Sequence, residues 1–99
     1  ILITDSLTPN GHKKGIANGE EVFLKNGVFI RKKDGVIAGS SLTMAQGLKN
    51  LITYGLNPKD AFLCACENPA KLVNAPEGIF KKGKKISFNI FDKNFNLVN

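Results

Sequence analysis

The sequence predicts an α/β fold, and three observations support that class. The chain opens with Ile1-Leu2-Ile3-Thr4-Asp5, a short apolar run that ends on a carboxylate. Such a run is typical of a strand buried on both faces in a parallel sheet or barrel. Apolar residues then recur every three or four positions between Thr43 and Tyr54, which is the period of an amphipathic helix. Asn57-Pro58 and Asn68-Pro69 each place a capping residue before a proline, a pattern that predicts the start of a helix.

Residues 6–19 are rich in Gly, Asn, Lys and Pro, and they predict a loop after the first strand. This loop holds the only histidine, His12. No second His, Cys or carboxylate stands at a ligand spacing from it, so an exposed loop residue is favoured over a metal ligand or a base.

Three short β-type runs follow the loop. Residues 21–24 and 28–31 flank Lys25-Asn26-Gly27, and Asn-Gly between two apolar runs is the strongest short-range signal for a hairpin. The turn Lys33-Asp34-Gly35 leads into the third run, residues 36–39. We expect a meander of small strands that forms a structural flap over a site.

The second half of the chain predicts helices and then strands. A helix from about Thr43 to Tyr54 ends at Gly55, a residue type that suits the left-handed position after a helix. A second helix from Pro58 to about Glu67 and a third over residues 70–73 follow. Residues 86–91 and 95–98 predict two strands, which need further strands beside them because a lone pair is marginal in water.

The charge and the cysteines narrow the classes of protein. The net charge is +6, from 14 Lys and Arg against 8 acids. The basic residues form short clusters without interleaved aromatic side chains, so solvated loops are favoured over nucleic-acid binding, with an anion site or an acidic partner as alternatives. Cys64 and Cys66 are two positions apart on a predicted helix and point about 200° apart. That favours reduced thiols that fill the core over a disulfide or a metal site.

Nothing in the sequence predicts a membrane partner. There is no secretory signal and no apolar run long enough to span a bilayer. A cytoplasmic location is expected, unless a targeting segment precedes the first residue.

Asp5 is the first candidate for catalysis. Chemistry in α/β proteins is concentrated at the carboxyl ends of strands, and Asp5 directly follows an apolar run and precedes a predicted loop. We expect it to be a catalytic acid or base. The alternative is an aspartate that initiates a turn, which is common after strands.

Three segments in order carry a family resemblance: Leu2-Ile3-Thr4-Asp5, then Val36-Ile37-Ala38-Gly39-Ser40-Ser41-Leu42-Thr43-Met44, then Asn68-Pro69-Ala70 followed by Gly78-Ile79 and Lys82-Gly83-Lys84. Together they resemble the C-terminal part of the amidohydrolase superfamily, and most closely its N-acetylglucosamine-6-phosphate deacetylases. The first and third segments are typical of the whole superfamily. The second, after a small hairpin, is more specific for the deacetylases.

The resemblance implies a fold and a division into domains. Residues 1–75 would be the C-terminal end of a (β/α)8 TIM-type barrel, with Ile1 to Thr4 as its last strand and a hairpin insertion at about residues 20–37. Residues 76–99 would supply part of a small β-sandwich. The chain would then be the last part of a longer enzyme, inactive alone and a homo-oligomer when complete.

The resemblance also implies a reaction. Asp5 would move a proton from metal-bound water to the departing amine as N-acetylglucosamine 6-phosphate is hydrolysed to glucosamine 6-phosphate and acetate. Ile37, Ala38 and Gly39 would line the site for this amino-sugar phosphate. The cofactor would be a divalent metal ion, expected to be zinc. The family's metal ligands and phosphate-binding residues have no counterpart here, so the metal would be bound mainly by residues outside this chain.

Two other functions remain open from the sequence. One is a different amidohydrolase that acts on another amide or a cyclic imide. The other is a non-catalytic basic module that binds an acidic partner through its hairpin and lysine clusters, with Asp5 as a strand-end cap.

Overall fold

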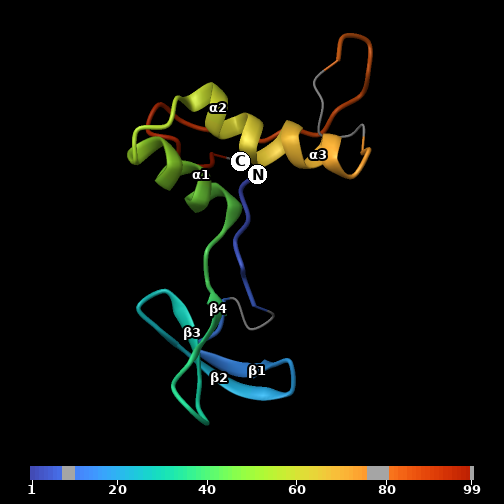
Figure 1. The fold of residues 1–99 in the computed structure, drawn as a ribbon. Helices are drawn as coiled ribbons and strands as arrows, with labels where there is room; N and C mark the ends of the chain where they lie inside the picture. The colour runs from blue at the N-terminus through green and yellow to red at the C-terminus, as the bar shows by residue number, and fades with distance from the viewer. Residues whose placement is uncertain (8–10, 76–80, 99) are drawn as a thin grey trace. The chain divides into compact units, whose positions relative to one another are not determined.

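A computed structural model describes residues 1–7, 11–75 and 81–98, so Gly78-Ile79 of the resemblance lies outside the described residues. The chain divides into two compact units (Figure 1). Thr4–Thr43 form the first, which we call the sheet unit. Ile1–Ile3 and Met44–Asn99 form the second, the helical unit. The domain boundary expected at residues 75–76 stays a prediction.

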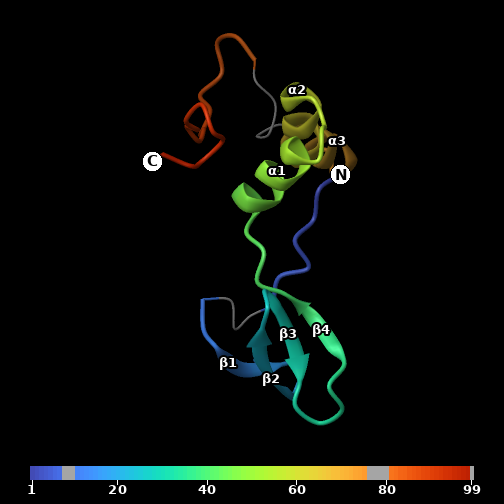
Figure 2. The same cartoon turned by 90° about the vertical axis from the view of Figure 1, so that its left-hand side faces the viewer.

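The sheet unit is built on a four-stranded antiparallel sheet in the order β1-β2-β3-β4 (Figure 2). Its strands are β1 (Lys14–Ala17), β2 (Glu20–Lys25), β3 (Val28–Arg31) and β4 (Ile37–Ser40). The predicted hairpin between β2 and β3 is confirmed. Asn26 and Gly27 have φ angles of 49° and 80°, as a two-residue turn of type I′ requires.

The prediction of a loop over residues 6–19 was wrong in its second half, because β1 lies there and pairs with β2. The turn between them, Asn18-Gly19, repeats the Asn-Gly signal, with φ angles of 51° and 79°. Strand β1 was not predicted because it has only four residues, and its lysine and glycine resemble loop residues. His12 is exposed, as predicted.

A small core holds the sheet unit together. Ala17, Val22 and Phe29 are buried on one face, and Leu7, Leu24 and Ala38 pack against them. Between β3 and β4 the register shifts, because Phe29 pairs with Gly39 while Ile30 pairs with Ile37. Ala38 is the extra residue of a β-bulge, a feature that bends a strand and redirects its side chains.

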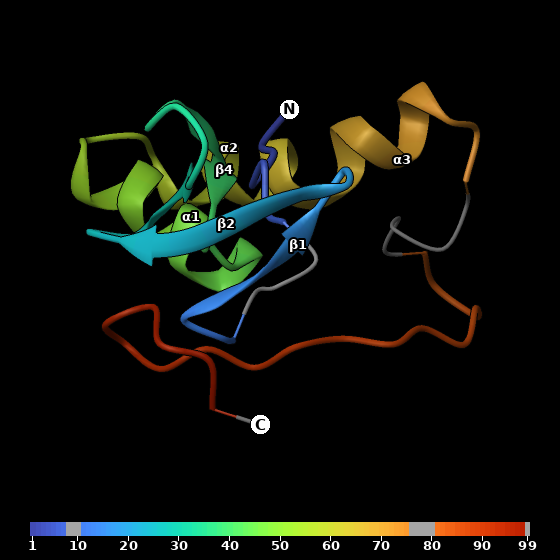
Figure 3. The ribbon, with the colours of Figure 1, turned by 90° about the horizontal axis from the view of Figure 1, so that it is seen from below.

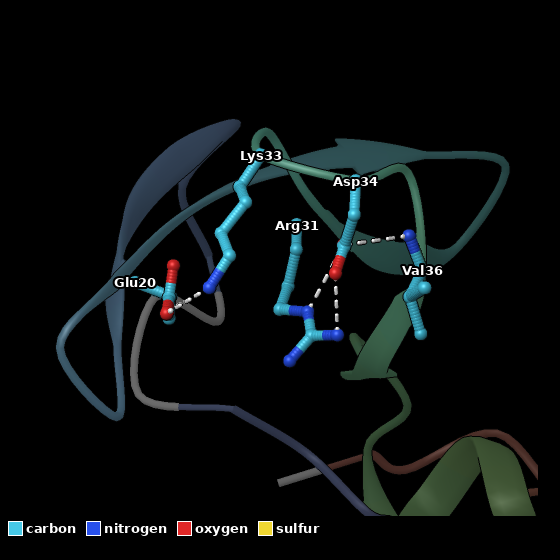
Figure 4. Close-up of polar contacts among 5 residues, drawn as sticks. All are labelled: Glu20, Arg31, Lys33, Asp34 and Val36. Atoms are coloured by element: carbon cyan, nitrogen blue, oxygen red, sulfur yellow. Dashed lines mark hydrogen bonds and ion pairs between the residues drawn. The ribbon is translucent and has the colours of Figure 1, made fainter.

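The basic cluster at the β3–β4 turn is paired with acids (Figure 4). The Arg31 guanidinium donates to both Asp34 carboxylate oxygens, at 3.1 and 2.7 Å. Lys32 Nζ lies 3.0 Å from Glu21 Oε2, and Lys33 Nζ lies 3.2 Å from Glu20 Oε1. All these groups are exposed or half-buried. The cluster is a solvated turn surface, as the sequence favoured.

The Asp34 carboxyl group provides a pH-dependent test of this turn. A hydrogen bond from the Val36 backbone N–H, and then the Arg31 guanidinium, lower the pKa of Asp34 below its usual 3.8. Since the folded pKa is lower, the charged form stabilises the fold, and this contribution is complete above pH 3.8 and lost as the pH falls through the folded pKa. We expect NMR titration to give a value below 3.8, raised in part by Arg31→Gln.

Lys32→Gln is the matched control for this titration, because Lys32 pairs with Glu21 instead of Asp34. It should leave the pKa of Asp34 where it is in the unmodified chain. A carboxyl of Asp34 that titrates at its usual value would contradict the arrangement in Figure 4.

Residues 1–4 do not form the predicted doubly buried strand. Ile1 and Ile3 are 58% and 73% exposed. Their segment is held in the helical unit by a backbone bond from Leu2 N to Cys64 O at 2.9 Å. Strands need neighbours that accept and donate hydrogen bonds, and within the described residues no strand pairs with this segment. The α/β class is confirmed, whereas the place of this segment in a barrel stays a prediction.

The helical unit contains α1 (Met44–Thr53), α2 (Pro58–Phe62), the π-helical turn η1 (Leu63–Glu67) and α3 (Asn68–Leu72). The predicted helices are confirmed. After α1, the N–H groups of Gly55 and Leu56 bond to Ile52 O and Leu51 O, the pattern of a Schellman cap.

The starts of α2 and α3 differ. Asn57 Oδ1 accepts from Lys59 N at 2.8 Å and caps α2, as predicted. Asn68 does not cap α3, because its own backbone is helical and its N–H bonds to Leu63 O, five residues back. The wide π-turn carries the chain from α2 into α3 without a break. It also leaves Cys66 exposed and Cys64 half-buried, so the expectation of a core-filling thiol was wrong for Cys66.

Residues 81–98 follow the helices as an extended trace without a regular strand (Figure 3). The two strands predicted here reduce to a single antiparallel bridge between Phe91 and Leu97 around a turn anchored by Asp92. Contacts with helices replace strand pairing: the ring of Phe91 meets Phe62 edge to face at 5.4 Å, and Lys49 Nζ lies 2.6 Å from Asn96 Oδ1. In the described part of the chain, no helix is both long and apolar enough to cross a bilayer.

Candidate active site at the Asp5 turn

The segment Thr4 to Leu7 lies beside the end of β4 in the sheet unit. Ser6 forms a parallel bridge with Ser40. The Ser40 backbone N–H donates to Asp5 O at 2.7 Å, and Leu7 N donates to Ser40 O at 3.2 Å. The Asp5 turn is therefore joined to the sheet by backbone hydrogen bonds at Asp5 and at Leu7.

Asp5 itself has an unusual backbone conformation and an exposed side chain. Its φ angle is 50°, in the left-handed region that costs energy for most residues but that Asp and Asn tolerate. Its side chain is exposed. The turn holds the backbone in a fixed conformation while presenting the carboxylate to solvent, which suits a group that exchanges protons with a bound molecule.

Gly39 is required by its close approach to this turn. A Cβ atom at residue 39 would lie 2.8 Å from Asp5 O and 2.7 Å from Leu7 Cγ. Such distances are too short for any side chain, so only glycine allows β4 to carry the Asp5 turn at this separation. The resemblance implied that Gly39 lines the sugar site, and the structure shows that its lack of a side chain also makes room for the Asp5 turn.

The structure thus brings Asp5 and Gly39 together. The other two candidates of the sugar site are beside them on β4. Ala38 is the half-buried bulge residue, and Ile37 is 65% exposed at the start of the strand. Their contact with a sugar stays a prediction. Ser40 was not selected as a site residue from the sequence, because its contacts with Thr4, Asp5 and Leu7 join segments that are far apart in the chain.

A metal site was tested on the side chains present. Among residues 1–7, 11–75 and 81–98, no three His, Cys, Asp or Glu residues gather into a group that could hold a metal ion. The described residues therefore do not form a metal centre by themselves. The role proposed for Asp5 involves only its own carboxylate.

An α/β fold that presents a carboxylate on a constrained turn, next to a strand edge that approaches it through a glycine, defines a candidate enzyme of acid–base chemistry. The family model described as "Amidohydrolase family" matches residues 12–99. The chain belongs to the amidohydrolase family.

Curated relatives point to one branch of that family. The chain is 33% identical over 97 residues to a "Putative N-acetylgalactosamine-6-phosphate deacetylase" of Escherichia coli (strain K12), covering 93% of this chain and 58% of the relative. It has the same identity, over 97 residues, to the N-acetylgalactosamine-6-phosphate deacetylase of Escherichia coli O157:H7, covering 93% of this chain and 26% of that enzyme.

Solved structures of deacetylases share the fold of this chain. The N-acetylglucosamine-6-phosphate deacetylase of Thermotoga maritima matches with a TM-score of 0.85 at 26% identity, over 99% of this chain and 28% of that one. An Asp-to-Ala mutant of the Mycobacterium smegmatis enzyme, in complex with N-acetyl-D-glucosamine-6-phosphate, matches with a TM-score of 0.78 at 26% identity, over 97% of this chain and 27% of that one. The Pasteurella multocida enzyme shares the fold, with a TM-score of 0.84 at 22% identity, over 96% of this chain and 26% of that one.

These comparisons confirm the resemblance to the amino-sugar-phosphate deacetylases. The chain spans 58% and 26% of the length of the two curated relatives.

Proposed function

We propose that this chain supplies the proton-transfer carboxylate of an amidohydrolase that removes the acetyl group from an N-acetylamino-sugar 6-phosphate. The observation that carries the proposal is the Asp5 turn, whose exposed carboxylate stands on a backbone fixed by Ser40 and Gly39. The names of the relatives supply the substrate class.

The role proposed for Asp5 is the transfer of one proton from water to the amine nitrogen. The carboxylate accepts a proton from the water that attacks the acetamide carbonyl. It then gives that proton to the amine nitrogen as the C–N bond breaks, and acetate and the amino-sugar phosphate leave. Acid–base catalysis by a placed side chain contributes about 10²- to 10⁴-fold to a rate. A proton acceptor for this step must remain accessible, and Asp5 is exposed.

The substrate and setting follow from the same reasoning. N-acetylglucosamine 6-phosphate is the proposed substrate. Its epimer N-acetylgalactosamine 6-phosphate is the alternative, because both curated relatives are named as deacetylases of that sugar phosphate. Ile37, Ala38 and Gly39 are proposed to line the sugar site. The proposal includes a zinc ion held mainly by residues outside this chain, a homo-oligomeric complete enzyme and a cytoplasmic location.

The alternative of a basic binding module has less support. The Arg31 to Lys33 cluster, the most compact basic stretch of the sheet unit, is engaged in three ion pairs with Asp34, Glu21 and Glu20. Each of these acids offsets part of the positive charge that the cluster presents to an acidic partner.

A hybrid enzyme tests the proposal. Residues 1–99 would replace the matching segment of the O157:H7 deacetylase, and acetate release would be measured with both N-acetylhexosamine 6-phosphates. We expect hydrolysis of at least one sugar, and the ratio of the two kcat/KM values identifies the preferred epimer. A hybrid that is folded by circular dichroism but releases no acetate from either would overturn the proposal. The same exchange into the T. maritima enzyme provides a second scaffold should the first not fold.

A further inference from the structure

We propose that Ser40 is the positioning residue of Asp5, acting through the backbone on either side of it. The inference rests on the proposed role of Asp5 and adds to it a residue whose side chain touches neither substrate nor reacting atoms. It follows from hydrogen bonds, from the backbone angle of Asp5 and from the packing of Gly39, all within the sheet unit.

Ser40 makes four hydrogen bonds, and three of them reach the Asp5 turn. Its hydroxyl donates to Thr4 O at 2.5 Å, just before Asp5. Its N–H donates to Asp5 O at 2.7 Å, and its C=O accepts from Leu7 N at 3.2 Å. The fourth bond runs from Leu42 N to the Ser40 hydroxyl at 3.0 Å. Ser40 therefore forms hydrogen bonds with the chain before Asp5, at Asp5 and after Asp5.

Of the three hydrogen bonds from Ser40 to the Asp5 turn, only the one made by the hydroxyl depends on the side chain. Any residue other than proline at position 40 can keep the two backbone bonds to Asp5 and Leu7, whereas the bond to Thr4 O is made by the hydroxyl of the serine side chain. The Ser40 side chain is half-buried, and its partner Thr4 is half-buried too. A bond shielded in this way competes less with water and holds its geometry better than an exposed one.

The backbone of Asp5 is where this restraint matters. With a φ angle of 50°, Asp5 occupies a sparsely populated region, and residues keep such conformations only when their surroundings impose them. Gly39 closes the other side, since its Cα approaches Asp5 O too closely for any side chain. Leu7 packs against the core and anchors the far end of the turn.

The consequence for a reaction is a specific kinetic signature. A proton-transfer group that moves by about 1 Å loses up to about 100-fold in rate even when the substrate still binds. Ser40 should therefore affect kcat and leave KM nearly unchanged, because the interaction lost belongs to the transition state.

Ser41 provides a matched control. It is the next residue, also half-buried, and its hydroxyl donates to Gly27 O at 3.1 Å, in the hairpin turn instead of the Asp5 turn. Replacing either serine by alanine removes one hydroxyl and one hydrogen bond to a backbone carbonyl, and Ser40→Ala also removes the bond that Leu42 N donates to the hydroxyl. The Asp5 backbone therefore reports the loss of the bond to Thr4 O, because Leu42 lies on the other side of Ser40 in the sequence.

The experiment has a kinetic arm and a structural arm. In the hybrid enzyme, Ser40→Ala should lower kcat by about 10- to 100-fold with KM changed less than twofold, Ser41→Ala should leave both constants unchanged, and Ser40→Thr should restore most of kcat. In the 99-residue chain, the NMR coupling between the amide and α protons of Asp5 reports its φ angle. This coupling should change in Ser40→Ala and stay constant in Ser41→Ala.

The outcomes separate this inference from the proposed function. If Ser40→Ala matches Ser41→Ala in kcat and in the Asp5 coupling, Ser40 does not position Asp5 and the inference is overturned, whatever the hybrid hydrolyses. If the hybrid is inactive but the Asp5 coupling changes only in Ser40→Ala, the structural restraint stands and the proposed function fails.

Discussion

Asp5→Asn is expected to lower the kcat of sugar-phosphate deacetylation in the hybrid enzyme by about 10²- to 10⁴-fold, the range that a placed acid or base contributes. Asparagine has nearly the same shape and also tolerates a left-handed backbone, so the φ angle of 50° should persist. What is lost is the ability of the side chain to accept and return a proton. Initial rates of acetate release at saturating substrate measure the effect.

Asp34→Asn is the control for this variant. It makes the same chemical change on another exposed aspartate of the sheet unit, whose carboxylate is engaged with Arg31 and Val36 N. Its kcat should equal that of the parent hybrid. If Asp5→Asn keeps more than a tenth of the parent kcat while Asp5 retains its φ angle, another group transfers the proton.

The largest expected effect on stability is that of Phe29→Ala. Phe29 is fully buried at 0% exposure and lies in the cluster with Ala17 and Val22. Truncating a buried phenylalanine costs about 3–5 kcal/mol, because both the hydrophobic transfer and the cavity count against the variant. That is a large share of the roughly 5–15 kcal/mol that stabilises a typical domain. Amide hydrogen exchange of β2 and β3 measures the loss.

Phe23→Ala is the counterpart on the exposed face of the same sheet. Phe23 is 39% exposed and lies on β2, so the same truncation should cost under about 1 kcal/mol. Equal losses in both variants would mean that the core does not lie where the burial of Phe29 puts it.

Local chemistry made the helices and one hairpin predictable. Asn26-Gly27, Asn57-Pro58 and Gly55 each act on their own neighbours, and the structure places each at the predicted turn, cap or helix end. Strand β1 was missed although Asn18-Gly19 carries the same turn signal. A four-residue strand with lysine and glycine has too little alternation to stand out.

The predictions that failed concern strands that need partners. Ile1 to Thr4 and residues 86–98 have β-type sequences, but neither pairs within a sheet in the part of the chain that the structure describes. A β-type hydropathy pattern shows that a segment is suited to a sheet. It does not show whether a neighbouring strand is present to pair with it. Hence Ile3 and Phe88 are exposed where burial was expected.

Strand-end position and family resemblance select Asp5 and Gly39 as candidates from the sequence, and their roles stay predictions. The contacts that hold the Asp5 turn could not be predicted in this way. The contact between Ser40 and Thr4 has no local signal, since this hydroxyl bond spans 36 residues. Sequence patterns of a few residues cannot report contacts of this range.

The same separation has a consequence for the order of folding. The turns at Asn18-Gly19 and Asn26-Gly27 close over two residues, whereas the contact between Thr4 and Ser40 closes a loop of 36. Loop closure costs more entropy as the loop lengthens, so we expect the hairpins to form before the contacts around Asp5. The conformation of Asp5 should then be set late in folding, and local opening of the sheet unit should release Asp5 before the hairpins separate.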